Sequence, residues 1–483
     1  MLGIVRISLL VFLAAVSTGA SAQFKVLHSF SGTDGASPNA LIQTADGFFY
    51  GSAANGGDVN ACSPDGCGTL FKSDSAGNVT VLHVFHASDG YSPTGLVKGS
   101  DGNFYGTTAS GGQPSGGGAG TIFRVDPAGN FTVLYAFVGG LGCCDGAGPT
   151  AHMIQASNGN FYGTTGAGGR FRDIDHQGGF GTVFQFNPVS GAVTILHSFN
   201  LADGNGIFPN GHLIQATNGF LYGTTREGGA TAFRIDTSGN FSLLAHLPGT
   251  QPLAGLIQAS DGNFYGTEEG VSGGGSVFRV TPTGTFSIIN RFESLDGWRP
   301  HFGLLQAADG LFYGTAPQGG LLDFQGGDIF RLDASGTLSI LRSFLISGPD
   351  GFIPNSQLIQ GADGALYGTT GFGGPGKYGT IFRLDQRVRG PVASITVKLA
   401  VIHSGQSTTA TVTLSSPAPP GGFVVNLAAL SYQVSLPSKV TVQAGKTKRA
   451  FTIKALNVGA AQTFHVYTFA AGQGVRTILT ALP

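Results

Sequence analysis

Two short segments concentrate charged and aromatic side chains in a chain that otherwise has few of them. Only 11% of the 483 residues are charged. The segment RFRDIDHQ spans residues 170–177, and the segment LDGWRPH, which holds the only tryptophan, spans residues 295–301. An exposed tryptophan beside polar groups suits stacking on a sugar or a hot spot for a protein partner. The alternative for both segments is a loop that packs on itself.

Carboxylates extend this set of candidate residues. Glu227, Glu268 and the adjacent Glu269 follow a repeated Tyr-Gly-Thr motif. Paired carboxylates can hydrolyse glycosides, but no spacing here specifies that reaction. The sequence has no nucleophile elbow, phosphate-binding loop or HExxH motif, so we predict no catalytic residue. The predicted ligand-binding residues are Trp298, Arg299, His301, Arg170, Arg172, Asp173, Asp175, His176, Glu227 and Glu268.

Six further carboxylates precede glycine in recurring turns that end in proline. If they converged, their oxygens could hold a calcium ion. An aspartate at such a position also forms a turn by bonding its own backbone, and we favour this interpretation. We therefore predict no metal or cofactor, with calcium as the alternative. The carboxylates are those of Asp34, Asp89, Asp145, Asp203, Asp296 and Asp350.

A tandem repeat must position these side chains. A motif close to Tyr-Gly-Thr-Thr occurs seven times, at intervals of 43 to 60 residues. One clear unit, residues 95–137, divides into four β segments at 95–99, 103–108, 120–126 and 131–137. Four antiparallel strands repeated at this interval are typical of a propeller blade. The alternatives are a β-solenoid, whose repeats are shorter, and a series of small domains whose cores would be too small.

The two ends of the repeat region indicate how the ring closes. The third strand of the unit occurs for the seventh time at residues 379–385, and no fourth strand follows it. A fourth-strand sequence, FKVLHSF, stands instead at residues 24–30. We therefore predict an all-β protein with a seven-bladed β-propeller closed by its N-terminal strand. Histidines in the LHSF segments (His28, His83 and His197) are expected at half-exposed blade edges.

The last part of the chain lacks the repeat. Polar and apolar residues alternate in residues 407–414, 423–429, 449–455 and 463–469. Alternation with intervening turns predicts an Ig-like β-sandwich of about seven strands. The predicted domains are a signal peptide at 1–22, a propeller at 23–389 and an Ig-like sandwich at 390–483.

The N-terminus and the cysteines indicate export. Residues 1–22 combine Arg6, an apolar core and a small-x-small cleavage site, which favours a secretory signal over an uncleaved membrane anchor. Export makes disulfides plausible, and we expect a Cys62–Cys67 bridge beside a vicinal pair, Cys143 and Cys144, although cross-pairing stays open. A formal net charge of −1 argues against a nucleic-acid partner.

The repeat resembles a known family. HVFHASDGYSPTGLVKGSDGNFYGTT at 83–108 and SFLISGPDGFIPNSQLIQGADGALYGTT at 343–370 are similar to the GloVer-type tandem repeat of bacterial exported proteins. The resemblance covers roughly residues 24–385 and implies an exported, often surface-attached protein with no established activity.

From the residues and this resemblance we expect an extracellular, cell-surface or periplasmic binding or adhesion protein. One propeller face would hold a glycan or protein ligand. A carbohydrate-active enzyme (a hydrolase or lyase) with its site at the central mouth, and a structural envelope protein, are the alternatives.

Overall fold

The computed structural model describes residues 24–60, 62, 64–113, 118–139, 145–171, 178–270, 274–322, 325–346, 348–385, 391–470 and 472–483. The predicted signal peptide, Cys143, Cys144 and the charged residues Arg172, Asp173, Asp175 and His176 lie outside these ranges. The described part is all-β, with one short 3₁₀ turn at Leu201–Asp203 and no α-helix. No helix in it has the length and apolar character that a membrane span requires.

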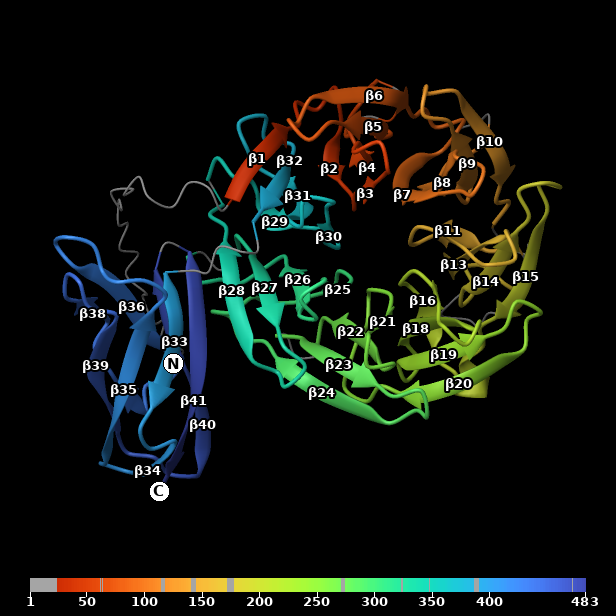
Figure 1. The fold of residues 1–483 in the computed structure, drawn as a ribbon. Helices are drawn as coiled ribbons and strands as arrows, with labels where there is room; N and C mark the ends of the chain where they lie inside the picture. Colours follow the sequence, from red (N-terminus) through yellow and green to blue (C-terminus); the bar gives the residue numbers. More distant parts are fainter. Residues whose placement is uncertain are drawn as a thin grey trace, which may run out of the picture.

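Seven antiparallel sheets, each built around one Tyr-Gly strand, lie around a common centre (Figure 1). We number them in chain order. The first sheet contains β2 (Ala36–Pro38), β3 (Ile42–Gln43), β4 (Phe49–Asn55), β5 (Thr69–Ser73) and β6 (Val79–Val84), and the second β7 (Tyr91–Lys98), β8 (Phe104–Ser110), β9 (Thr121–Val125) and β10 (Phe131–Ala136). The third contains β11 (Ala147–Pro149), β12 (Ile154–Gln155), β13 (Phe161–Ala167), β14 (Thr182–Phe186) and β15 (Val193–Ser198), and the fourth β16 (Ile207–Pro209), β17 (Ile214–Gln215), β18 (Leu221–Glu227), β19 (Thr231–Ile235) and β20 (Phe241–His246).

The remaining sheets follow the same order. The fifth contains β21 (Ile257–Gln258), β22 (Phe264–Glu268), β23 (Ser276–Val280) and β24 (Phe286–Arg291), and the sixth β25 (Leu305–Gln306), β26 (Phe312–Ala316), β27 (Asp328–Leu332) and β28 (Leu338–Ser343). The seventh contains β29 (Phe352–Pro354), β30 (Ile359–Gln360), β31 (Leu366–Phe372), β32 (Thr380–Leu384) and β1 (Phe24–Ser29).

The seventh sheet takes its outer strand from the other end of the chain, as predicted. β1 pairs antiparallel with β32, from Phe24 opposite Leu384 to Ser29 opposite Thr380. Without β1, β32 would present a row of unpaired backbone groups at the sheet edge. The N-terminal strand therefore joins the first and last repeats.

The sequence predicted one continuous inner strand in each sheet, but in most sheets this strand is divided into two short segments. In the first sheet β2 ends at Pro38 and β3 starts at Ile42, and both pair with β4. Ser37, directly before that proline, has a φ of +52°, a left-handed value that interrupts a strand. Proline also lacks the N–H that a continuous ladder needs.

Neighbouring sheets are joined by contacts that repeat around the ring. Several motif tyrosines pack against an aromatic ring of the next sheet, as Tyr105 does against Phe161 with ring centroids 4.3 Å apart. Tyr367 of the seventh sheet stacks in the same way on Phe49 of the first, at 4.4 Å. These contacts confirm that the tyrosines fill space between sheets. The glutamine at the end of the inner strand also accepts a hydrogen bond from the preceding sheet, in Gln43, Gln155, Gln215, Gln258, Gln306 and Gln360.

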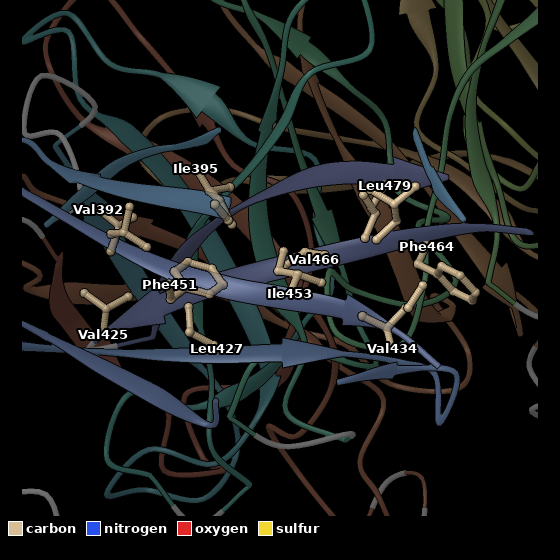
Figure 2. Close-up of a cluster of buried hydrophobic side chains, with 14 of the residues drawn as sticks. Val392, Ile395, Val425, Leu427, Val434, Phe451, Ile453, Phe464, Val466 and Leu479 are labelled. Atoms are coloured by element: carbon tan, nitrogen blue, oxygen red, sulfur yellow. The ribbon is translucent and has the colours of Figure 1, made fainter. Parts of the chain in front are cut away.

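The C-terminal region forms two facing sheets around one apolar core (Figure 2). Alternation places one side of each strand inward, as Ala410 and Val412 of one sheet and Val425 and Val466 of the other illustrate. The region has nine strands, more than the seven or so expected, because short strands flank the alternating ones. They are β33 (Val392–Val397), β34 (Val401–His403), β35 (Ser407–Leu414), β36 (Phe423–Ala429), β37 (Val434–Ser435), β38 (Lys439–Val442), β39 (Lys448–Ala455), β40 (Gln462–Ala470) and β41 (Gln473–Leu482).

One of these sheets continues into the ring. β41 pairs antiparallel with β28, where Val475 lies opposite Ser339 and Gly474 opposite Ile340. The backbone N–H of Ser343 donates a 2.8 Å hydrogen bond to the carbonyl of Gly472. The C-terminal region thus covers the outer edge of the sixth sheet, as Figure 1 shows beside β28.

Candidate functional site

The tryptophan loop occupies a position that recurs in the ring. Trp298 forms an isolated antiparallel bridge with Gln318. The same cross-strand position holds Ala36 opposite Asn55 in the first sheet and Ile207 opposite Glu227 in the fourth. The side chains differ from repeat to repeat while the backbone pairing stays the same. This pair of positions is therefore a variable surface on a constant frame, a common place for binding residues.

The backbone conformation of Arg299 recurs in other sheets, whereas the side chain at this position differs from sheet to sheet. Its φ is +60°, and Ser37, Ser92, Phe208 and Ile353 have φ values of +52° to +57° at the same place before proline. Its N–H donates a 2.8 Å hydrogen bond to the carbonyl of Gly274. Because the conformation recurs in other sheets, its strain belongs to the turn and does not itself indicate function.

The side chains of this loop form a small exposed group. The Arg299 guanidinium makes an ion pair with Glu269. Trp298 is 37% exposed, which leaves part of the indole free to contact a ligand. His301 offers less surface to a ligand than Trp298 does, because its ring is half-buried against Phe302, with ring centroids 4.5 Å apart. Burial lowers the pKa of His301 to about 4, so the ring is neutral at neutral pH.

Glu268 lies inside the protein. It is 1% exposed, and Ser276 donates a 2.5 Å hydrogen bond to its Oε1. Glu268 and Ser276 are cross-strand partners at a position that holds two hydrogen-bonded threonines in other sheets. These pairs are Thr108–Thr121, Thr165–Thr182, Thr225–Thr231 and Thr370–Thr380. Glu268 therefore replaces a threonine of the repeated hydrogen-bonded pair, and its side chain is buried away from the surface.

Glu227 lines an open groove of about 590 Å³ between two loops of the fourth and fifth sheets. Its carboxylate lies 3.6 Å from the Nε of Arg226, and both side chains are about 40% exposed. The groove is lined by Arg226, Glu227, Gly228, Gly229, Ala230, His246, Leu247, Pro248, Gly249, Thr250 and Gln251. Sequence reasoning missed the segment 246–251, which carries no charge cluster or motif.

The groove adjoins the tryptophan loop. The N–H of Glu269 donates a 3.2 Å hydrogen bond to the carbonyl of Gln251, which lines the groove. Glu269 in turn pairs with Arg299. Contacts thus run from the 246–251 loop through Glu269 to Arg299, the neighbour of Trp298 in the sequence. We call Glu227, the 246–251 loop, Arg299 and Trp298 the groove site.

Arg170 is exposed, and its backbone N–H donates a 3.2 Å hydrogen bond to the Ser198 hydroxyl. Its guanidinium lies 5.9 Å from the Phe171 ring centroid. Among the described residues, no contact links Arg170 to the groove site. The remaining predicted members of its segment lie outside the described ranges.

The turn carboxylates are engaged in their own loops. Asp34 accepts hydrogen bonds from the Ser31 N–H and contacts His28 Nε2, each at 2.8 Å. Burial acts to raise the pKa of Asp34, but the hydrogen bonds from His28 and Ser31 outweigh it and hold the pKa below its usual value. Asp89 repeats this arrangement with His86 and His83.

These contacts support the interpretation of the carboxylates as turn residues. His28 and His83 are partly exposed in outer strands, as predicted, and each contacts a carboxylate there. Within the described ranges, no group of three or more histidine, cysteine, aspartate or glutamate side chains could hold a metal ion. The calcium alternative stays an untested prediction.

Asp296 departs from this pattern. The outer-strand position that holds His28 or His83 elsewhere is Asn290 here, and Arg476 of β41 bonds both Asp296 and Asn290. Tyr467 donates a 2.7 Å hydrogen bond to Glu293, and His465 lies 2.6 Å from the same carboxylate. Burial lowers the pKa of Arg476 to about 10, so it stays charged at neutral pH. The candidate Asp296 therefore holds the C-terminal region in place.

The loop beside the first sheet carries the predicted bridge between Cys62 and Cys67. A disulfide is consistent with an exported protein.

A family described as the Gloeobacter/Verrucomicrobia repeat matches residues 15–232 and again residues 228–416. No protein with a curated description matches the chain. Among solved structures, a putative 6-phosphogluconolactonase from Bacteroides fragilis is 17% identical, with 68% of this chain and 89% of that chain covered and a TM-score of 0.45. A quinonprotein alcohol dehydrogenase-like protein from Bacteroides thetaiotaomicron is 13% identical, with 62% and 64% covered and a TM-score of 0.39. An exo-beta-1,3-galactanase from Phanerochaete chrysosporium is 13% identical, with 92% and 95% covered and a TM-score of 0.33.

Proposed function

Because the chain belongs to the Gloeobacter/Verrucomicrobia repeat family, a tandem-repeat family, we propose that it is an exported binding protein with a ligand site on one face of a β-propeller. In this proposal each of the seven sheets is one blade of a domain spanning residues 23–389. Residues 390–483 form an Ig-like module, and residues 1–22 are a cleaved signal peptide. The protein acts outside the cytoplasm, in the extracellular space, at the cell surface or in the periplasm.

The groove site carries this proposal. A groove of about 590 Å³ lies in the size range of small-ligand sites. Arg226, Glu227 and His246 supply hydrogen-bonding groups to its wall, and Trp298 offers an exposed aromatic ring on the adjoining loop. A concave wall that carries a few hydrogen-bonding groups, with an aromatic ring on the next loop, suits a saccharide whose hydroxyls bond the wall while an apolar face stacks on the ring.

A glycan fits this surface better than a protein partner does. Stable protein interfaces bury about 800 Å² on each partner, which calls for a broad surface around a well-packed apolar centre. The groove is lined by only eleven residues, among them the charged Arg226 and Glu227. A binding role is preferred to glycoside hydrolysis because that reaction uses two carboxylates at the substrate, and Glu268 is buried in a hydrogen bond with Ser276.

Binding to a panel of polysaccharides tests the proposal. Glu227→Ala and Trp298→Ala should each weaken binding of the best glycan about tenfold, in line with the roughly 1–2 kcal/mol of a good contact. Val189→Ala, at a fully exposed turn residue outside the groove site, is the matched control and should bind normally. Unchanged binding in both groove variants would remove the site, and release of sugar from any polysaccharide would replace the binding role with the enzymatic one.

A further inference from the structure

The C-terminal region differs in charge from the ring. All 26 aspartates and glutamates of the chain lie before residue 390, whereas seven of its 25 lysines and arginines lie after it. One of the seven, Arg476, pairs with Asp296 at the junction with the ring. The net charge of −1 therefore hides a region whose charged side chains are all cationic. The other six are exposed, and within the described residues none of them makes an ion pair: Lys398, Lys439, Lys446, Lys448, Arg449 and Lys454.

One end of this region, which we call the tip, is where β33, β36 and β39 end and β35 and β37 begin. It lies at the end of the core where Val434 is labelled in Figure 2. The N–H of Leu456 donates a 2.8 Å hydrogen bond to the carbonyl of Gln433. The N–H of Leu399 donates a 3.0 Å hydrogen bond to the Thr408 hydroxyl, near the start of β35. Three segments thus form the tip, at 398–401, 430–433 and 456–461.

Large apolar side chains are exposed on all three segments of the tip. Tyr432 is 90% exposed, and Leu430 and Leu456 are 47% and 38% exposed. Leu399 and Val401 are each just over half exposed. Single exposed apolar side chains are normal on a protein surface. Five of them gathered at one end of a small region indicate instead a contact with a partner or a membrane.

Two of the exposed lysines accompany these apolar side chains. Lys454 lies opposite Ser407, at the end of β39 that leads to Leu456. Lys398 directly precedes Leu399. The tip therefore combines aliphatic and aromatic side chains with positive charge, and its three segments contain no carboxylate.

A bilayer with negatively charged head groups is a partner that uses both features. Apolar side chains enter the boundary between head groups and acyl chains, while lysines are attracted to the anionic head groups. A soluble polyanion would contact the lysines but leave the apolar side chains in water. Two tips facing each other would bring like charges together, because neither supplies a carboxylate to pair with the lysines.

We propose that the tip docks on the surface of a membrane that contains anionic lipids. Its five apolar side chains enter the lipid interface, and Lys398 and Lys454 contact the head groups. The attachment is peripheral and reversible, because it rests on a few side chains and on charge. The sheet that continues into the ring is thereby held at the membrane through β41.

Flotation of the chain from residue 23 to residue 483 with lipid vesicles tests the charge part of this inference. The chain should bind vesicles of phosphatidylcholine and phosphatidylglycerol in equal parts about tenfold more tightly than vesicles of phosphatidylcholine alone. Lys398→Glu/Lys454→Glu should weaken that binding about tenfold or more. Lys446→Glu/Lys448→Glu changes two exposed lysines at the opposite end of the region, so this matched control should lose less than about threefold.

The apolar part is tested on the same vesicles. Tyr432→Ser/Leu456→Ser should weaken binding about tenfold, because two side chains no longer enter the interface. Val424→Ser, at an exposed valine of β36 outside the tip, is the matched control and should bind normally. All these positions are exposed, so the variants should melt as the unmodified chain does.

Several results would overturn the inference. These are equal binding to the two kinds of vesicle, equal losses in the tip and control variants, and normal binding by Tyr432→Ser/Leu456→Ser. Heparin binding that needs the two lysines but not Tyr432 would assign the tip to a soluble polyanion. A dimer in light scattering that Tyr432→Ser/Leu456→Ser abolishes would assign it to a second copy of the chain. Glycan binding by the groove site is a separate measurement, so either result stands without the other.

Discussion

Two strands from opposite ends of the chain cover the outer edges of two neighbouring sheets, and they do so by different means. β1 completes the seventh sheet with five paired positions, and its His28 contacts Asp34 as His83 contacts Asp89 in the next repeat. β41 pairs with the sixth sheet at only two positions. A charged cluster around Asp296 adds to that junction, and Tyr467 packs in one apolar cluster with Leu338 and Ile340 of the sixth sheet. The first junction reuses the contacts of the repeat, whereas the second depends on side chains that occur once.

The difference shows how a repeat can accept a foreign partner. In the repeats the turn aspartate takes a partner from the preceding outer strand, for example Tyr135 for Asp145 and Arg342 for Asp350. Before Asp296, the outer-strand position is occupied by Asn290, which carries no charge. The Asp296 side chain is only 1% exposed, so its carboxylate needs a cation from another strand. Arg476 supplies it. One substitution in the outer strand thus creates a docking position without altering the turn.

The largest effect is expected from removal of β1. A chain that starts at Ser31 loses the paired edge of β32 and the fully buried Phe30. Loss of a buried phenylalanine alone costs about 3–5 kcal/mol, so the melting temperature should fall by about 10 °C or more. Calorimetry against a chain that starts at Phe24 measures this effect. Equal melting of the two chains would show that β1 does not close the ring.

The second prediction compares the two kinds of junction directly. Asp296→Ala leaves the buried Arg476 without its carboxylate and should cost about 3–5 kcal/mol in urea unfolding. Asp34→Ala should cost less, about 1–2 kcal/mol, because the contact between His28 and Asp34 is partly exposed and its loss leaves no fully buried charge.

A double-mutant cycle with Arg476→Ala isolates the coupling between Asp296 and Arg476. Equal losses in Asp34→Ala and Asp296→Ala, or additive effects in the cycle, would contradict the special role of the docking position.

The smallest effect concerns Asp328, which lies where five other sheets have threonine. Burial raises the pKa of Asp328 well above its ordinary value, although a hydrogen bond from Ser343 opposes this shift. The folded protein therefore keeps a proton that the unfolded chain releases above about pH 4, so stability falls as pH rises from there. The threonines are Thr69, Thr121, Thr182, Thr231 and Thr380.

Asp328→Thr should remove this dependence. Relative to the unmodified chain, the variant should gain about 1 kcal/mol at pH 8, and the gain should shrink toward pH 4. Melting temperatures across that range measure the effect. Ser276→Thr, at the same position of the fifth sheet, should leave the pH slope unchanged. A gain of equal size at every pH would show that ionisation of Asp328 is not the cause.

The repeat made part of this structure predictable from sequence. The pairing of FKVLHSF with the last repeat and the stacking of the tyrosines follow from motifs that recur at every junction, and both are observed. The short spacing between Cys62 and Cys67 similarly indicated their bridge.

Contacts that occur once could not be predicted in this way. Arg476 and Asp296 are 180 residues apart, and neither belongs to a motif that names the other. The sequence predicted Glu268 as a ligand-binding residue because it is one of the few carboxylates that follow a tyrosine motif, but the ladder turns its side chain inward against Ser276. The rings of His152 and His212 stack with centroids 4.5 Å apart, and no motif in the sequence pairs these two histidines.

The position of β1 and β41 also has a mechanical consequence. Tension applied between residue 24 and residue 483 enters the seventh sheet through β1 and the sixth sheet through β41, which are neighbours in the ring. While those pairings hold, the load passes between two adjacent sheets and the other five remain slack. The β41 ladder has fewer paired positions, so it should separate first, and the side chains around Asp296 then carry the load until the C-terminal region is released as an extensible arm.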